Sequence, residues 1–191
     1  MAQPPNLRDS RLIDVLDSKT RQPFASIVWR VAREGRDPVQ CSAPGGRWDD
    51  GTFDVLYTAL ESSGAVAEMH FHLQRGQPVF PSKLRYALHE LKLALSNVIT
   101  LSRQELAELG LNMAQFGQFA YDGRTSEYPT SQQIAEAAHF LDATAIIVPN
   151  ARWDCNNLVI FCDRISPGDV DLVKDHGLIA WASWTRKHQS R

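Results

Sequence analysis

The chain has 191 residues, a formal net charge of -2 and a hydrophobic share of 43%. This length suffices for one domain with its own core, and the near-neutral charge gives no overall attraction to nucleic acid or to an anionic membrane. No apolar run reaches the ~18 residues of a membrane-spanning helix, residues 1–10 lack a signal-peptide pattern, and the odd, scattered Cys41, Cys155 and Cys162 predict no disulfide framework and a reducing, cytoplasmic setting.

The first part of the chain predicts a short helix and two strands separated by a long loop. Residues 1–10 are polar and rich in proline, so we expect them to be poorly ordered. Residues 11–18 predict the short helix, whereas β-branched and aromatic residues predict strands over 24–33 and 52–59. The loop at 34–51 is rich in Gly, Pro and Asp, and loops of this length are often functional.

The middle of the chain predicts two helices on either side of a long strand. Ser62 or Ser63 can cap the first helix. Over 83–101 some leucines suit a helix, but others alternate along the chain, and we predict a strand. Ser102 and Glu105 then have the spacing of a capping box, which predicts a helix that ends at a glycine.

The last part of the chain predicts one more helix and three strands. An irregular segment at 110–130 precedes a helix at 131–141. Apolar runs predict buried strands at 144–149 and 157–162, and a last strand at 178–184. This order of elements predicts an α+β fold whose mixed, largely antiparallel sheet is flanked by helices, rather than a doubly wound parallel sheet.

Two arginines are candidates for binding an anionic ligand. Arg47 follows two glycines, where the backbone can bend sharply and approach a ligand. Its planar guanidinium matches a phosphate group in a bidentate way, although a loop arginine can also be simply solvated. Arg30 lies within an apolar strand, so its charge must either point outward or have a buried partner.

Tyr57 and Glu68 are candidates for contacts with the rest of such a ligand. Tyr57 ends the second predicted strand, either as a core residue or as a ring that stacks on a flat group with its hydroxyl left to form hydrogen bonds. Glu68 lies about 60° from the apolar face of its helix, with His72 one turn later. A carboxylate there is solvated, pairs with His72, or faces a cleft where it can stabilise positive charge.

Taken together, two arginines, a stacking tyrosine and a glutamate suit the cleavage of an N-glycosidic bond in a dinucleotide. His70 and His72 hint at a metal, but residues two apart on a helix point in different directions, so we expect none. The sequence has no P-loop, G-x-G-x-x-G or G-x-S-x-G motif.

The segments "WRV" at 29–31, "GGRWDDG" at 45–51 and "VLYTALESSGAVAE" at 55–68 resemble the RES-domain family, which is named for an Arg, a Glu and a Ser. The later "SQQIAEAAHFLDATAIIVPNA" and "NNLVIF" are also similar to it. The whole chain is interpreted as a single RES-like domain, with residues 1–20 as an N-terminal extension and 164–191 as its C-terminal part.

The resemblance implies a bacterial toxin that degrades NAD, with a fold similar to that of ADP-ribosyltransferases. It implies that Arg30 and Arg47 bind the pyrophosphate and that Tyr57 stacks near the nicotinamide. Glu68 would accept a hydrogen bond from the ribose and stabilise the oxocarbenium-like transition state. NAD is then the substrate, no metal is required, and the partner is a DNA-binding antitoxin that covers the active site. Association into a homo-oligomer is left open.

The family serine corresponds to Thr130 or Ser131, since "YPTSQQ" aligns in two ways. Many relatives also have a serine in a "VPSA" segment, where this chain has "VPNA" with Asn150. We expect Ser131 to act in catalysis and Thr130 and Asn150 to contact NAD. The reaction is hydrolysis or phosphorolysis of the nicotinamide–ribose bond. The alternatives are ADP-ribosylation of a protein, or a catalytically weakened scaffold that binds a nucleotide or an antitoxin.

Overall fold

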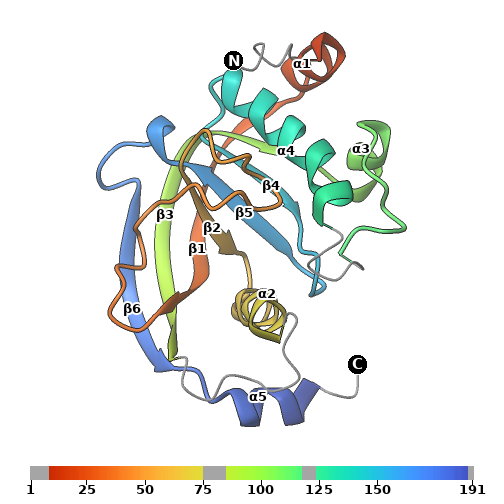
Figure 1. Ribbon diagram of the computed structural model, residues 1–191. Coiled ribbons are helices and arrows are strands. Elements are labelled where there is room, and N and C mark those ends of the chain that lie inside the picture. The colour runs from red at the N-terminus through yellow and green to blue at the C-terminus, as the bar shows by residue number, and fades with distance from the viewer. Residues whose placement is uncertain (1–8, 75–84, 118–123, 189–191) are drawn as a thin grey trace, which may run out of the picture.

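A computed structural model describes residues 9–74, 85–117 and 124–188. Its strands curve around a common interior, and its helices lie outside them (Figure 1). The strands are β1 (Arg21–Arg33), β2 (Val55–Ala59), β3 (Tyr86–Thr100), β4 (Ala145–Pro149), β5 (Asn156–Phe161) and β6 (Val170–Leu178). The helices are α1 (Ser10–Asp17), α2 (Ser62–Gln74), α3 (Arg103–Glu108), α4 (Arg124–Phe140) and α5 (Trp181–His188), with a short 3-10 helix at Cys162–Arg164.

Five strands pair in a ring, so that the sheet closes on itself. The order is β1–β2–β5–β4–β3, and β3 also pairs with β1. The β3–β4 pair is parallel and the other pairs are antiparallel. The prediction of an α+β fold with a mixed, largely antiparallel sheet is therefore confirmed, and the closure into a barrel is a feature that the sequence did not reveal.

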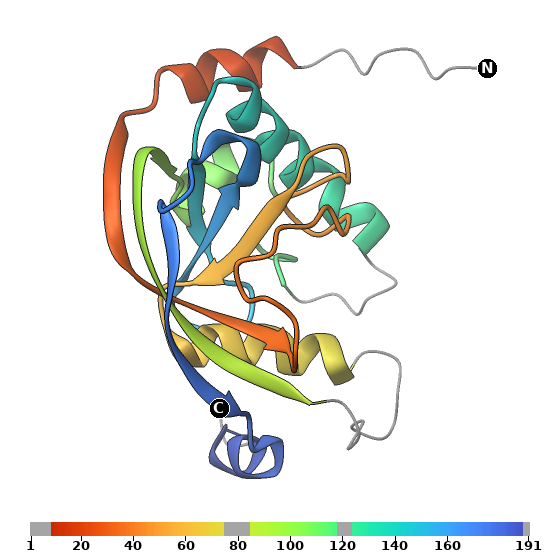
Figure 2. The same cartoon turned by 90° about the vertical axis from the view of Figure 1, so that its left-hand side faces the viewer.

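The length of β3 makes this closure possible. Its first part pairs with β6 and its last three residues pair with β4, while its other edge follows β1 from end to end. Long twisted strands coil, and a register shift in β1 between Gln22 and Phe24 adds to the bend. Figure 2 shows β1, β3 and β6 curving together along one side of the molecule.

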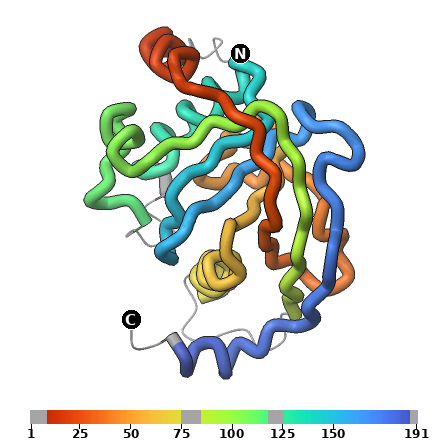
Figure 3. The backbone as a smooth tube through the Cα atoms, turned by 180° about the vertical axis from the view of Figure 1, so that it is seen from behind, coloured from red at the N-terminus to blue at the C-terminus, as the bar shows by residue number. Residues whose placement is uncertain are grey.

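The alternating leucines of β3 point into the barrel, as a period of two predicts. Leu91, Leu93 and Leu95 are buried there together with residues from every other strand of the ring. A second core lies between the outer face of the barrel and α1, α3 and α4. A third, smaller one joins α2 and α5 to the barrel. Figures 1 and 3 show α1, α3 and α4 at one end of the molecule, and α2 and α5 at the other.

Several predicted elements are confirmed with small changes of boundary. These are the helix at 11–18, the strands at 24–33, 52–59, 144–149 and 157–162, and the long strand at 83–101, of which 83 and 84 lie outside the described residues. The capping box is present, because Ser102 Oγ accepts from Glu105 N and Ser102 N donates to Glu105. The prediction for residues 1–10 concerns mostly residues outside the described part.

Two predictions near the end of the chain were wrong. The segment 110–130 was expected to be irregular. Residues 110–117 are, and 118–123 lie outside the described residues, but α4 begins at Arg124 and contains Pro129, because burial of Glu127 and Tyr128 holds its first turns against the protein. A last strand was expected at 178–184. The strand is instead the exposed β6, whose apolar side chains do not alternate regularly with polar ones, and α5 begins at Trp181. An edge strand exposed along almost its whole length lacks the apolar pattern that marks a strand.

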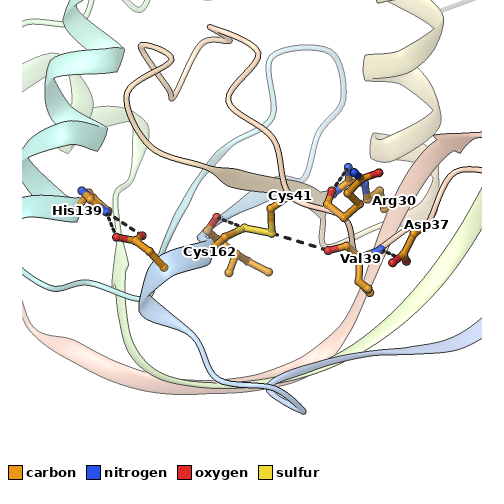
Figure 4. Close-up of a disulfide and its surroundings, with 9 residues drawn as sticks. Arg30, Asp37, Val39, Cys41, His139 and Cys162 are labelled. Atoms are coloured by element: carbon orange, nitrogen blue, oxygen red, sulfur yellow. Dashed lines mark hydrogen bonds and ion pairs between the residues drawn. A yellow bond between two sulfur atoms is a disulfide. The ribbon is translucent and has the colours of Figure 1, made fainter.

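Two of the three cysteines are paired, although no disulfide framework was expected. Cys41 and Cys162 form a disulfide across 121 residues of sequence (Figure 4). Their proximity follows from the strand register, since Ser42 bridges to Val55 and Val55 pairs with Phe161. Cys41 precedes Ser42 and Cys162 follows Phe161, a relation that sequence spacing alone does not reveal.

Among the described residues, no helix is both long enough and apolar enough to cross a membrane.

Candidate functional site

A cavity of about 410 Å³ opens between β1, β2 and α2. A further wall is the turn at residues 44–48, within the loop that joins β1 to β2. Arg30, Arg47, Tyr57 and Glu68 all line it, so the structure brings together four of the predicted site residues. The other lining residues are Trp29, Val31, Pro44, Gly45, Gly46, Trp48, Thr58, Ala59, Ala65, Met69, His72, Tyr128, Arg152 and Asn157.

The turn that carries Arg47 is built around the carboxylate of Asp49, which is fully buried. Asp49 accepts from the backbone nitrogens of Gly45 at 2.7 Å and Gly46 at 2.8 Å. Both glycines are required by geometry: Gly45 has φ +69°, and a Cβ on Gly46 would lie 2.7 Å from the hydroxyl of Tyr57. The turn therefore fixes the direction in which Arg47 leaves the backbone.

Side chains of helix α4 form hydrogen bonds to the same turn. The hydroxyl of Ser131 donates to the carbonyl of Arg47 at 2.7 Å, and Gln132 Nε2 donates to the carbonyls of Gly46 at 2.8 Å and Asp49 at 3.0 Å. Ser131 is fully buried and does not line the cavity. The structure thus places Ser131 behind the turn, where it supports Arg47.

The guanidinium of Arg47 already has an acidic partner. Nη1 forms an ion pair with Glu127, whose carboxylate also accepts from Gly117 N at 2.7 Å. The rings of Phe116 and Tyr128 lie 4.7 Å and 5.0 Å from the guanidinium carbon. Only 11% of the Arg47 side chain is exposed. Arg47 therefore presents a fixed, partly neutralised guanidinium to the cavity.

Tyr57 contributes its ring to the cavity, but its hydroxyl is already engaged. The hydroxyl donates to Asp49 at 2.7 Å and accepts from Trp48 N at 2.9 Å. Burial, reinforced by the charge of Asp49 and the hydrogen bond to it, raises the pKa of Tyr57 well above its ordinary value. The hydroxyl, expected to be left for a ligand, instead joins the middle of β2 to the turn.

Arg30 enters the cavity from β1, where its cross-strand partner is the buried His89. Its Nη2 donates to the carbonyl of Gln40 at 3.1 Å, and Figure 4 shows it beside the loop that contains the disulfide. Burial, and then repulsion from Arg36, lower its pKa to about 10, against the opposing attraction of Asp37. Arg30 stays cationic at neutral pH.

Glu68 extends from α2 toward the loop between β4 and β5. Its Oε1 accepts from Ala151 N at 3.2 Å and from Asn157 Nδ2 at 3.4 Å. The side chain is half-buried and lines the cavity, as does His72 one turn later on α2. The carboxylate is therefore oriented by two neutral donors.

Asn150 and Thr130 are not among the residues that line this cavity. Asn150 is buried, and its Oδ1 accepts from the backbone nitrogens of Arg152 at 2.7 Å and Trp153 at 2.9 Å. Its Nδ2 donates to Asn157 at 2.7 Å. Asn150 thus shapes the loop that orients Glu68, and Thr130 is half-buried on α4.

Sequence reasoning missed three charged residues of this region, Asp49, Glu127 and Arg152. Asp49 lies within "GGRWDDG", so its position next to the turn was a usable signal. Glu127 fell in the segment predicted to be irregular, and Arg152 lies in a short loop between two strands. In the described residues no three His, Cys, Asp or Glu side chains gather in a way that could hold a metal ion.

The chain is similar to known proteins in sequence pattern and in fold. The sequence model of the family described as the RES domain matches residues 27–182. Among solved structures, a chain of the crystal structure of the M. tuberculosis MbcT-MbcA toxin-antitoxin complex is similar, with a TM-score of 0.76 and 20% identity. The alignment covers 93% of this chain and 97% of that chain, which shows a shared fold. No curated protein matches the sequence.

Proposed function

Because the chain belongs to the RES-domain family, we propose that it is a toxin enzyme that cleaves the bond between nicotinamide and ribose in NAD. The observation that carries this proposal is that one oriented carboxylate, Glu68, lines a single cavity together with three arginines. These are Arg30, Arg47 and Arg152. A dinucleotide needs cations for its diphosphate, and cleavage of its glycosidic bond needs an anion beside the ribose.

The arginines serve binding in this proposal. Arg30 and Arg47 enter the cavity from different elements, and each presents a guanidinium that suits phosphate oxygens. Arg47 is partly neutralised by Glu127, so its contribution is a fixed direction of hydrogen bonding more than net charge. The ring of Tyr57 supplies a flat surface for the nicotinamide end.

Glu68 serves the chemical step. As the glycosidic bond lengthens, positive charge develops on the ribose ring, and a carboxylate that is already oriented stabilises that charge. Its hydrogen bonds from Ala151 N and Asn157 hold it in place before the reaction. Nicotinamide leaves, and water or phosphate completes the reaction as acceptor. The fold similarity to ADP-ribosyltransferases remains part of this proposal.

The partner in this proposal is an antitoxin, a DNA-binding protein that covers the cavity. Support comes from the similar solved structure, which is that of a toxin-antitoxin complex. An enzyme that consumes NAD harms its own cell unless it is inhibited, and occlusion of the cavity is the simplest form of inhibition.

Incubation of the purified chain with NAD, followed by chromatography of the products, tests the proposal. We expect free nicotinamide together with ADP-ribose, or with ADP-ribose 1-phosphate when phosphate is the acceptor. Transfer of labelled ADP-ribose to protein would instead indicate an ADP-ribosyltransferase. If neither nicotinamide nor a labelled protein is formed, the proposed function is wrong.

A further inference from the structure

A second cavity, of about 610 Å³, lies on the other side of α2. We call it the aromatic cavity, because Phe71, Trp153 and Trp184 line it together with Arg103, Arg152 and His70. Phe71 and His70 belong to α2, Trp184 to α5, and Trp153 to the loop between β4 and β5. The RES-domain site described above does not include it.

The two cavities meet at one residue. Arg152 lines both of them, whereas the α2 residues divide, with Glu68 on the side of the first cavity and Phe71 on the side of the aromatic cavity. The helix thus forms a wall between the cavities, and Arg152 lies at its edge. A ligand that occupied both cavities would contact Arg152 at their junction.

The side chain of Arg152 is held by stacking. Its guanidinium carbon lies 3.2 Å from the centroid of the Phe71 ring. Within the described part of the chain its Nε is buried without a hydrogen-bond partner, and burial lowers its pKa from the ordinary value. The unpaired Nε can therefore donate a hydrogen bond to an anion, and the charge of that anion would offset the desolvation of the guanidinium.

The walls of the aromatic cavity suit a nucleobase. The ring centroids of Trp153 and Trp184 lie 6.3 Å apart at an interplanar angle of 45°, and both half-buried rings line the cavity. Purine rings stack on such indole surfaces. Arg103 and Arg152 line the same cavity and outnumber its one described carboxylate, Asp154, which leaves the positive charge that an adenosine phosphate requires.

We propose that the aromatic cavity binds the adenosine half of NAD, with Trp153 and Trp184 against the adenine and Arg152 on a diphosphate oxygen at the junction. This inference rests on the proposed function, since it assigns the two halves of the same substrate to two cavities. The nicotinamide riboside half then occupies the first cavity beside Glu68.

The test compares NAD with nicotinamide mononucleotide, which contains the same scissile bond but lacks adenosine. For Trp184→Ala we expect the ratio of kcat/KM for NAD to kcat/KM for the mononucleotide to fall about tenfold, since base stacking contributes on this scale. Trp184→Phe should retain much of the ratio. The matched control, Arg186→Ala, changes an exposed residue of α5 that does not line the cavity and should leave the ratio unaltered.

Two outcomes overturn the inference. One is an unchanged ratio in Trp184→Ala, whether neither substrate is affected or both lose activity equally, and the other is a loss for the mononucleotide that exceeds the loss for NAD. If the wild-type chain cleaves neither substrate, the proposed function fails, and equilibrium binding of AMP then decides the inference alone. Binding of AMP that Trp184→Ala weakens supports the adenosine cavity, and absence of AMP binding to the wild type overturns it.

Discussion

Glu68 is the residue on which the proposed reaction depends most directly. It is half-buried at the boundary of α2, so Glu68→Gln keeps its size and should leave the fold intact. Loss of the carboxylate removes stabilisation of the transition state, and we expect nicotinamide release to slow about 10²–10³-fold. Rates are measured alongside thermal melting. Near-normal turnover, or a loss that accompanies a lower melting temperature, would contradict the assigned role.

Glu127 is the counterion of the buried Arg47. The Arg47 and Glu127 side chains are only 11% and 6% exposed, so their ion pair is largely removed from water. Glu127→Gln leaves the charge of Arg47 without its counterion. We expect the free energy of unfolding to fall by about 3–5 kcal/mol, as for other broken buried pairs. Urea unfolding at neutral pH measures it.

The control for this prediction is an ion pair near the surface, Arg164 with Asp142, whose side chains are 33% and 74% exposed. Asp142→Asn should change the free energy of unfolding by less than ~1 kcal/mol, because exposed pairs are screened by water and salt. Equal effects of Glu127→Gln and Asp142→Asn would show that the Arg47 pair is not effectively buried.

At the residue scale the sequence predicted the side chains that face the cavity better than those that support them. Arg47 stood out through its two glycines, and Glu68 through its place beside an apolar helical face. The supports are Asp49, Glu127 and Ser131, which act on residues up to 84 positions away in the sequence. The contacts of Glu127 and Ser131 depend on tertiary structure, and local pattern carries no sign of them, whereas Asp49 stands next to the turn that it supports.

At Gly64, α2 packs tightly against the loop between β4 and β5. A Cβ there would collide with Cys155 Sγ and lie 3.2 Å from Asn150 Nδ2. Although alanine favours a helix by ~1 kcal/mol, we expect Gly64→Ala to lower the free energy of unfolding by about 1–3 kcal/mol through overpacking. Urea unfolding measures the change.

A double-mutant cycle isolates the cause. Cys155→Ala removes the sulfur, so Gly64→Ala should cost less stability in that background than in the wild type. The same variants report on Glu68, because displacement of α2 shifts its carboxylate away from Ala151. An identical cost of Gly64→Ala in both backgrounds would show that the sulfur does not determine the requirement for glycine.

At the scale of elements, the sequence predicted those whose burial follows a local period. The alternating leucines of β3 and the capping box of α3 are examples. The start of α4 was missed because Pro129 argues against a helix, while tertiary burial of Tyr128 favours one. The edge strand β6 was missed because it gains stability from backbone pairing with β3 rather than from apolar side chains.

The disulfide acts on the molecule as a whole, since it joins the loop after β1 to the end of β5. In protein purified without reductant and then denatured, we expect one reactive thiol per chain, that of Cys155, and three after reduction. Reduction should lower the free energy of unfolding by about 2–4 kcal/mol. If the pairing of Cys41 with Cys162 is correct, Cys155→Ser should remove the one thiol that reacts before reduction. Three reactive thiols before reduction would contradict the pairing.

The closed ring of strands also determines when, during synthesis, the site can exist. Cavity residues run from Trp29 to Asn157, and β2 lies between β1 and β5, the last strand of the ring to be made. At about 5–20 residues per second, a ribosome needs roughly 6–25 s to pass from one end of the site to the other. A nascent chain therefore carries no assembled site until most of its length has been translated. For a toxin of the kind proposed, products truncated before β5 lack the assembled site, and an inhibitor that recognises the cavity meets only chains that contain β5.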